Sequence, residues 1–97
     1  MEKVPAVYMM ANKKNGTIYT GVTSNLISRY YKHKNKLIKG FTHTYNCTKL
    51  VYYEIHGTMN GAIEREKQLK SGSRKKKIIL INNQNPLWND LGKNLLL

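Results

Sequence analysis

Alternating apolar and polar residues predict two β-strands near the start of the chain. The stretches Val4–Ala11 and Thr17–Thr23 both follow the period of two that is typical of a half-buried strand. Asn15-Gly16 lies between them and is a hairpin signal, because a two-residue type I′ turn needs positive φ at both central positions. Such a turn would pair position 8 with position 23.

The two faces of this predicted hairpin differ in chemistry. One face would be aliphatic and would meet the core, with Val7, Met9, Ala11, Ile18 and Val22. The other face would carry Tyr8, Tyr19 and Gly21. We expect this second face to line a partly exposed surface.

The remaining pattern predicts helices around one further strand. Thr23, Ser24 and Asn25 are N-cap residues, and Ser73 can cap a later helix. The expected elements are a helix from about Leu26 to about Ile38, a strand over Leu50–Ile55, a helix from about Met59 to Lys70, a helix from Ser73 to Ile81, and a short helical turn or loop over Pro86–Leu91. With 97 residues, the chain fits one domain.

Two helical positions carry charge where chemistry is possible. At 100° per residue, Glu66 falls in the middle of the apolar stripe formed by Met59, Ala62, Ile63 and Leu69. A carboxylate there is unfavourable unless it is paired or binds a cation, so Glu66 either forms an ion pair with Lys67 or Lys70 or holds a metal. Arg29 and His33 point the same way, beside the stripe of Leu26, Tyr30, Lys34 and Leu37, and could also be an ordinary solvated face.

The net charge of the chain indicates what kind of molecule it binds. Seventeen Lys and Arg face five Asp and Glu, a net charge of +12, which attracts polyanions. Nucleic acid is the leading partner, because the cations are spread over several segments rather than along one amphipathic membrane helix. The expected backbone contacts are Lys32, Lys36, Lys67, Lys70, Arg74, Lys75, Lys76 and Lys77. The alternative is that these lysines only confer solubility.

Location follows from what the sequence lacks. No apolar run is long enough to span a bilayer, and the N-terminal residues lack the pattern of a signal peptide, so we expect neither a membrane span nor secretion. Cys47 is the only cysteine, so we expect it to be a small buried apolar residue in a cytoplasmic protein.

Five short motifs occur in one order along the chain: Ala6-Val7-Tyr8, Tyr19-Thr20-Gly21, Asn25-Leu26-Ile27-Ser28-Arg29, the stretch from Ala62 through Glu66 to Leu69, and Pro86-Leu87-Trp88-Asn89. In this order they resemble the motifs of the GIY-YIG nucleases. The first motif departs from that pattern at two of three residues and the second at one, but both tyrosines and the glycine are kept. The likeness is closest to short stand-alone bacterial members related to the N-terminal nuclease domain of the bacterial excinuclease.

This resemblance implies a fold and an activity. The implied fold is α+β, a small three-stranded antiparallel sheet flanked by helices, which agrees with the order of elements predicted above. The implied activity is metal-dependent endonucleolytic cleavage of nucleic acid, with DNA favoured and repair or processing as the setting. A non-catalytic basic binding module, or an accessory subunit, is the alternative.

The resemblance also assigns roles to individual residues. Glu66 would bind one Mg²⁺ or Mn²⁺, and Arg29 would hold the phosphate through two parallel hydrogen bonds. Tyr8 would take the proton from water, with its pKa lowered by Arg29, the metal and the basic field. The supporting roles fall to Tyr19, which would orient water or phosphate, to His33, which would bind phosphate or share the proton transfer, and to Asn89, which would position these groups or act only as a cap.

Overall fold

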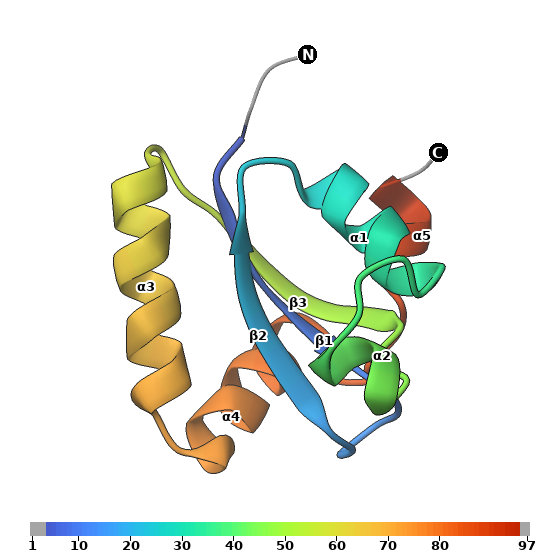
Figure 1. Ribbon diagram of the computed structural model, residues 1–97. Coiled ribbons are helices and arrows are strands. Elements are labelled where there is room, and N and C mark those ends of the chain that lie inside the picture. The colour runs from blue at the N-terminus through green and yellow to red at the C-terminus, as the bar shows by residue number, and fades with distance from the viewer. Residues whose placement is uncertain (1–3, 96–97) are drawn as a thin grey trace.

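A three-stranded antiparallel sheet in the order β2-β1-β3 is the frame of the molecule (Figure 1). This computed structural model describes residues 4–95. Its elements are β1 (Ala6–Ala11), β2 (Ile18–Thr23), α1 (Leu26–Lys34), α2 (Phe41–Thr44), β3 (Lys49–Ile55), α3 (Met59–Ser71), α4 (Arg74–Gln84) and α5 (Gly92–Leu95). The predicted fold class is confirmed.

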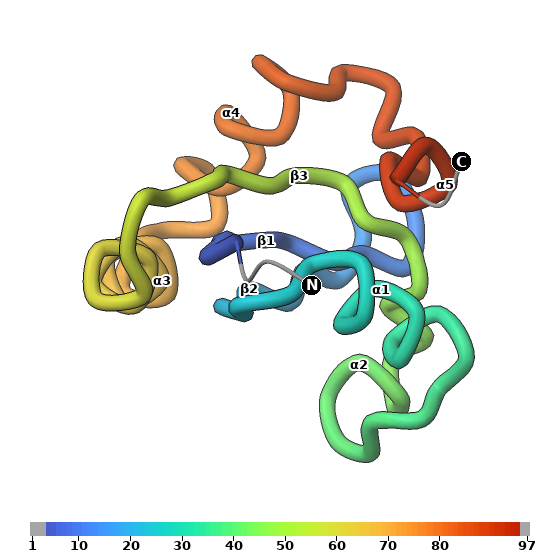
Figure 2. Tube along the Cα trace, turned by 90° about the horizontal axis from the view of Figure 1, so that it is seen from above, coloured from blue at the N-terminus to red at the C-terminus, as the bar shows by residue number. Residues whose placement is uncertain are grey.

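Helices cover both faces of the sheet, as the view from above shows (Figure 2). On one face, α3 and α4 pack against the aliphatic side chains of the strands, with Ala62, Leu69 and Ile81 buried there. On the other face, α1 and α5 pack over Tyr8, and the buried Cys47 lies in this second cluster as expected. No helix within residues 4–95 has the length and apolar character to cross a membrane.

The predicted register of the hairpin is wrong by two residues. Tyr8 pairs with Gly21 rather than with Thr23, and the ladder ends at Ala11 and Ile18. The loop is longer than two residues because the Thr17 amide donates to Asn12 Oδ1 at 3.0 Å. Of Asn15 and Gly16, only Asn15 has a positive φ, of 59°, so the type I′ turn does not form. A shift of two keeps every side chain on its face, so the predicted division into an aliphatic and a tyrosine face is confirmed.

Helix α1 is shorter than predicted, because it ends at Lys34 rather than near Ile38. The amide of Leu37 donates to Lys32 O, and the amide of Lys36 donates to His33 O, which together close a Schellman motif. Lys36 holds the left-handed position of that motif with a φ of 55°. Glycine is the usual residue there, so a lysine gives no stop signal in the sequence.

The outer edge of β3 is covered by side chains of the segment that follows. Gln84 accepts from the Tyr53 amide at 3.0 Å and donates to the Tyr53 carbonyl at 2.9 Å. Asn85 donates to Val51 O, and Asp90 accepts from the Leu50 amide. These side chains satisfy backbone groups that a fourth strand would otherwise bond.

Candidate active site

Tyr8 and Tyr19 meet on the face of the sheet that α1 covers, above Gly21. Their ring centroids are 6.2 Å apart. Tyr8 is 1% exposed, whereas Tyr19 on the edge strand β2 is half-buried. The expectation that both tyrosines line a partly exposed surface is therefore wrong for Tyr8, because α1 is packed directly over it. Tyr19 is the ring of this pair that faces solvent.

A buried hydrogen-bonded chain runs from Tyr8 into the helices. The Tyr8 hydroxyl lies 2.8 Å from His33 Nε2, and His33 Nδ1 lies 2.9 Å from Thr42 Oγ1. His33 is buried because α1 turns Leu26, Tyr30 and His33 toward the sheet. The predicted stripe that continued through Lys34 and Leu37 is wrong, since both of these residues are exposed.

Burial sets the protonation of this pair. It lowers the pKa of His33 to about 4, and the Arg29 guanidinium acts in the same direction. His33 is therefore neutral at pH 7. Burial also raises the pKa of Tyr8 well above its ordinary range, and Tyr19 raises it further, while Arg29 lowers it. In the protein alone, burial outweighs the single nearby cation, so Arg29 does not lower the pKa of Tyr8 below its ordinary value. The lowering that was expected with a bound metal stays a prediction.

Arg29 and Glu66 complete the group around Tyr8. Both lie near enough to influence the pKa of Tyr8, Arg29 from α1 and Glu66 from α3. The Glu66 side chain is 14% exposed and forms an ion pair with Lys70 at 3.4 Å. Lys70 Nζ also lies 5.9 Å from the centroid of the Tyr19 ring. The structure thus gathers five of the sequence-predicted residues at one place: Tyr8, Tyr19, Arg29, His33 and Glu66.

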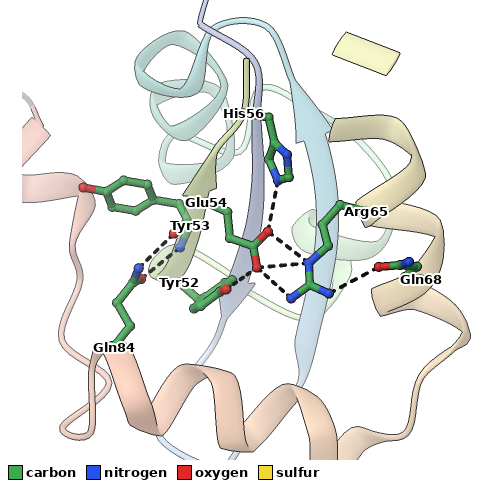
Figure 3. Close-up of polar contacts among 7 residues, drawn as sticks. All are labelled: Tyr52, Tyr53, Glu54, His56, Arg65, Gln68 and Gln84. Carbon is green, nitrogen blue, oxygen red and sulfur yellow. Dashed lines mark hydrogen bonds and ion pairs between the residues drawn. The ribbon is translucent and has the colours of Figure 1, made fainter. Parts of the chain in front are cut away.

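An ion pair on the opposite face fixes the rotation of α3 (Figure 3). Arg65 donates to both carboxylate oxygens of Glu54 on β3, at 3.0 to 3.2 Å. Burial acts to raise the pKa of Glu54, but hydrogen bonds from Arg65, Tyr52 and His56 outweigh it and hold the pKa below its usual value. Because Arg65 precedes Glu66, this anchored side chain determines which way Glu66 points.

The donor set fits a metal that needs one protein ligand. Within residues 4–95, no group of three or more His, Cys, Asp or Glu side chains could enclose an ion. The Glu66 carboxylate is paired with the Lys70 ammonium beside the half-buried Tyr19, so a metal would have to displace this ammonium. Mg²⁺ keeps several of its waters and accepts one or two carboxylates, so Glu66 suits it.

Two other predicted residues lie in different surroundings. Asn89 is exposed beyond the outer edge of β3, and its backbone bonds Asn85. Arg74 donates to the carbonyls of Asn15 and Gly16, at 2.8 and 2.6 Å, and so ties α4 to the hairpin loop. The three lysines that follow Arg74 lie in the first turn and a half of α4, where Lys75 and Lys76 are exposed.

Sequence reasoning missed two groups of residues that shape the site. Thr42 lies in the four-residue helix α2, which is too short to produce a periodic pattern. Glu54 and Arg65 are far apart in the sequence, and only the packing of α3 on the sheet brings them together. The alternation in β3, which sets Tyr52 and Glu54 on one face, was the available signal for Glu54.

Several known proteins resemble this chain in sequence and in fold. The family model described as the GIY-YIG catalytic domain matches residues 4–78. A UPF0213 protein of Staphylococcus saprophyticus is 37% identical over 68 residues, which are 70% of this chain and 83% of that protein. One from Syntrophus aciditrophicus is 38% identical over 71 residues, 72% of this chain and 80% of that protein. The solution NMR structure of a UPF0213 protein from Bacillus halodurans is similar with a TM-score of 0.53 and 27% identity, covering 84% of this chain and 86% of that one.

Proposed function

Because this chain belongs to the GIY-YIG catalytic domain family, we propose that it is an endonuclease that hydrolyses phosphodiester bonds with one divalent metal ion. The supporting observation is the buried hydrogen bond between Tyr8 and a neutral His33, beside Arg29 and Glu66. DNA is the favoured polymer and repair or processing the favoured setting, because the motifs resemble those of the excinuclease nuclease domain.

Tyr8 and His33 together accept the proton of the attacking water. As water gives a proton to Tyr8 Oη, the Tyr8 proton moves to His33 Nε2. When the hydrogen of the neutral His33 ring is on Nδ1 and forms a hydrogen bond to Thr42 Oγ1, Nε2 has a free lone pair for this step. A lasting phenolate is disfavoured by the raised pKa of Tyr8, so the second transfer has to accompany the first.

Arg29, Tyr19 and Glu66 act on the phosphate. Arg29 is half-buried and donates two parallel hydrogen bonds to a phosphate oxygen pair. Tyr19 is the more exposed tyrosine, so it meets the substrate first and orients the water or the phosphate. Glu66 would hold Mg²⁺ or Mn²⁺, which when bound neutralises charge on a phosphate oxygen and on the leaving group. Asn89 has no part in this proposal.

Surface lysines supply affinity that is independent of base sequence. Lys32 and Lys36 at the end of α1, Lys67 and Lys70 on α3, and the run Lys75–Lys77 on α4 are the proposed backbone contacts. Arg74 is left to anchor the hairpin loop.

Substitutions that each remove one functional group test the proposal. Tyr8→Phe keeps the ring, so cleavage in Mg²⁺ should fall about a hundredfold or more while substrate affinity stays nearly constant. His33→Gln should fall by a similar factor, and Tyr19→Phe by less. Glu66→Ala is the control for metal dependence. If Tyr8→Phe and His33→Gln both cleave at the parent rate, the proton relay is wrong.

A nucleic-acid-binding module without catalysis is the second candidate. The ion pair between Glu66 and Lys70 favours it, because a lysine already neutralises the carboxylate that a metal would need. This candidate predicts tight, salt-dependent binding and no cleavage in Mg²⁺ or Mn²⁺ of single-stranded, flapped or branched DNA. Cleavage that disappears in Glu66→Ala would exclude it.

A further inference from the structure

Two exposed aromatic rings lie together at the short helix α2, whose first residue is Phe41 and whose C-cap is Tyr45. Phe41 is 45% exposed and Tyr45 is 49% exposed, and their ring centroids are 4.7 Å apart with an interplanar angle of 43°. The two residues are four positions apart along one helical turn, so they share a face. Apolar rings that gather in water at one place mark a binding surface more often than scattered ones do.

These rings extend the aromatic side of the candidate active site. Phe41 lies 6.0 Å from Tyr19 between ring centroids, and Tyr19 lies 5.6 Å from His33. Thr42, which follows Phe41, turns inward and bonds His33. The same helical turn is therefore fixed to the proton relay on its inner side and presents two rings to solvent on its outer side.

Two lysines lie near the row of rings Tyr19, Phe41 and Tyr45. Lys70 Nζ lies over the Tyr19 ring at 5.9 Å. Lys36 bonds the side chain of Asn46, the residue after Tyr45. A ligand that suits this row has flat apolar groups beside negative charges, because the protein carries a net charge of +12.

We propose that Phe41 and Tyr45 form a stacking site for unpaired nucleobases next to the scissile phosphate. Base faces are free only where a strand is unpaired, because a duplex buries them and offers its backbone and groove edges. The inference rests on the proposed nuclease function and names its substrate class: single strands, flaps or bases turned out of a duplex. The charge pattern favours a polyanion over an apolar peptide.

Binding without cleavage gives the first test. Affinities for a labelled oligothymidylate and for a blunt duplex are measured by fluorescence anisotropy in EDTA. Tyr45→Leu should weaken binding to the single strand about tenfold, the scale of one lost base–aromatic stack, and change duplex binding less than about twofold. Tyr45→Phe should bind as the parent does. Tyr31→Leu, at a tyrosine 54% exposed on α1, is the matched control and should have no effect.

A fluorescent base gives the second test. 2-Aminopurine in the strand should be quenched on binding to the parent and to Tyr45→Phe, and should stay bright with Phe41→Leu and Tyr45→Leu. Equal losses of single-strand and duplex affinity, or equal effects of Tyr31→Leu and Tyr45→Leu, would overturn the stacking site. If single strands bind through the rings but are never cut, only the nuclease proposal fails; if Tyr45→Leu binds and cuts single strands as the parent does, only the stacking site fails.

Discussion

Gly21 lies directly opposite Tyr8 in the β1–β2 pair, and the ring of Tyr8 fills the space above it. A Cβ at position 21 would come within 2.6 Å of both Cζ and Oη of Tyr8, and within 2.9 Å of Cε2 of Tyr19. The missing side chain is therefore what allows the two rings to approach each other.

Gly21→Ala should disturb both stability and activity. The added methyl group must displace a buried ring, which costs about 1 to 3 kcal/mol in well-packed interiors. Urea denaturation measures the loss, and the cleavage rate should fall because Tyr8 moves relative to His33. Gly57→Ala is the matched control, since a Cβ there meets no heavy atom within 4 Å. Equal stability of the two variants would contradict the packing described for Gly21.

Stability should fall between pH 7 and pH 5 because of His33. Its pKa is about 4 in the folded protein and about 6.5 in an unfolded chain, so the unfolded state binds more protons as the pH drops below 6.5. The contribution of His33 is fully present above pH 6.5 and is lost progressively toward pH 4. The difference between pH 7 and pH 5 should be about 2 kcal/mol in urea denaturation.

A variant without the imidazole isolates this effect. His33→Gln should show a flatter stability profile over the same pH range. The paired carboxyls Glu54 and Asp90 do not interfere, because their pKa values are lowered and they titrate at more acidic pH. Parallel profiles for the parent and His33→Gln would mean that His33 is protonated without penalty in the folded protein.

Lys70 should compete with the metal for Glu66. Since the ammonium lies 3.4 Å from a Glu66 oxygen, we expect Lys70→Met to reach half-maximal cleavage at a Mg²⁺ concentration lower by a factor of about three or more. The rate is measured at saturating substrate, so that weaker nucleic-acid binding does not enter. Lys67→Met on the same helix is exposed and serves as control. A higher Mg²⁺ requirement in Lys70→Met would show that the lysine assists the metal.

The basic residues of α4 should separate into two kinds. Reversal of Lys75, Lys76 and Lys77 to Glu should weaken binding to all sequences alike and flatten the dependence of affinity on salt. Arg74→Ala should instead lower the free energy of unfolding by about 1 kcal/mol, because it frees the hairpin loop. An unchanged salt slope in the triple variant would place nucleic acid elsewhere.

Local patterns predicted most of the fold. Alternation identified β1, β2 and their faces, and β-forming residues identified β3. Cap residues located the starts of α1 and α4, and the apolar stripe located α3. The predictions of the hairpin register and of the end of α1 failed because single residues there act against their usual preference. Asn12 lengthens the hairpin loop through its side chain, and Lys36 takes a glycine-like conformation at the end of α1.

The sequence identified the residues around Tyr8 but could not give their protonation. The pKa values of Tyr8 and His33 follow from burial under α1 and α2, which depends on how these helices pack on the sheet. For the same reason Thr42 was missed. The exposed pair Phe41 and Tyr45 was missed too, because no periodic pattern in the sequence indicated that these rings lie together.

The side chains of Gln84, Asn85 and Asp90 along β3 also bear on aggregation. An open strand edge is a template on which another chain can add a strand and begin an aggregate. Here the amide of Gln84 occupies both backbone groups of Tyr53, so an incoming strand would have to displace it. Gln84, Asn85 and Asp90 therefore disfavour self-association through the open edge of the sheet, although their sequence resembles an ordinary solvated helix end.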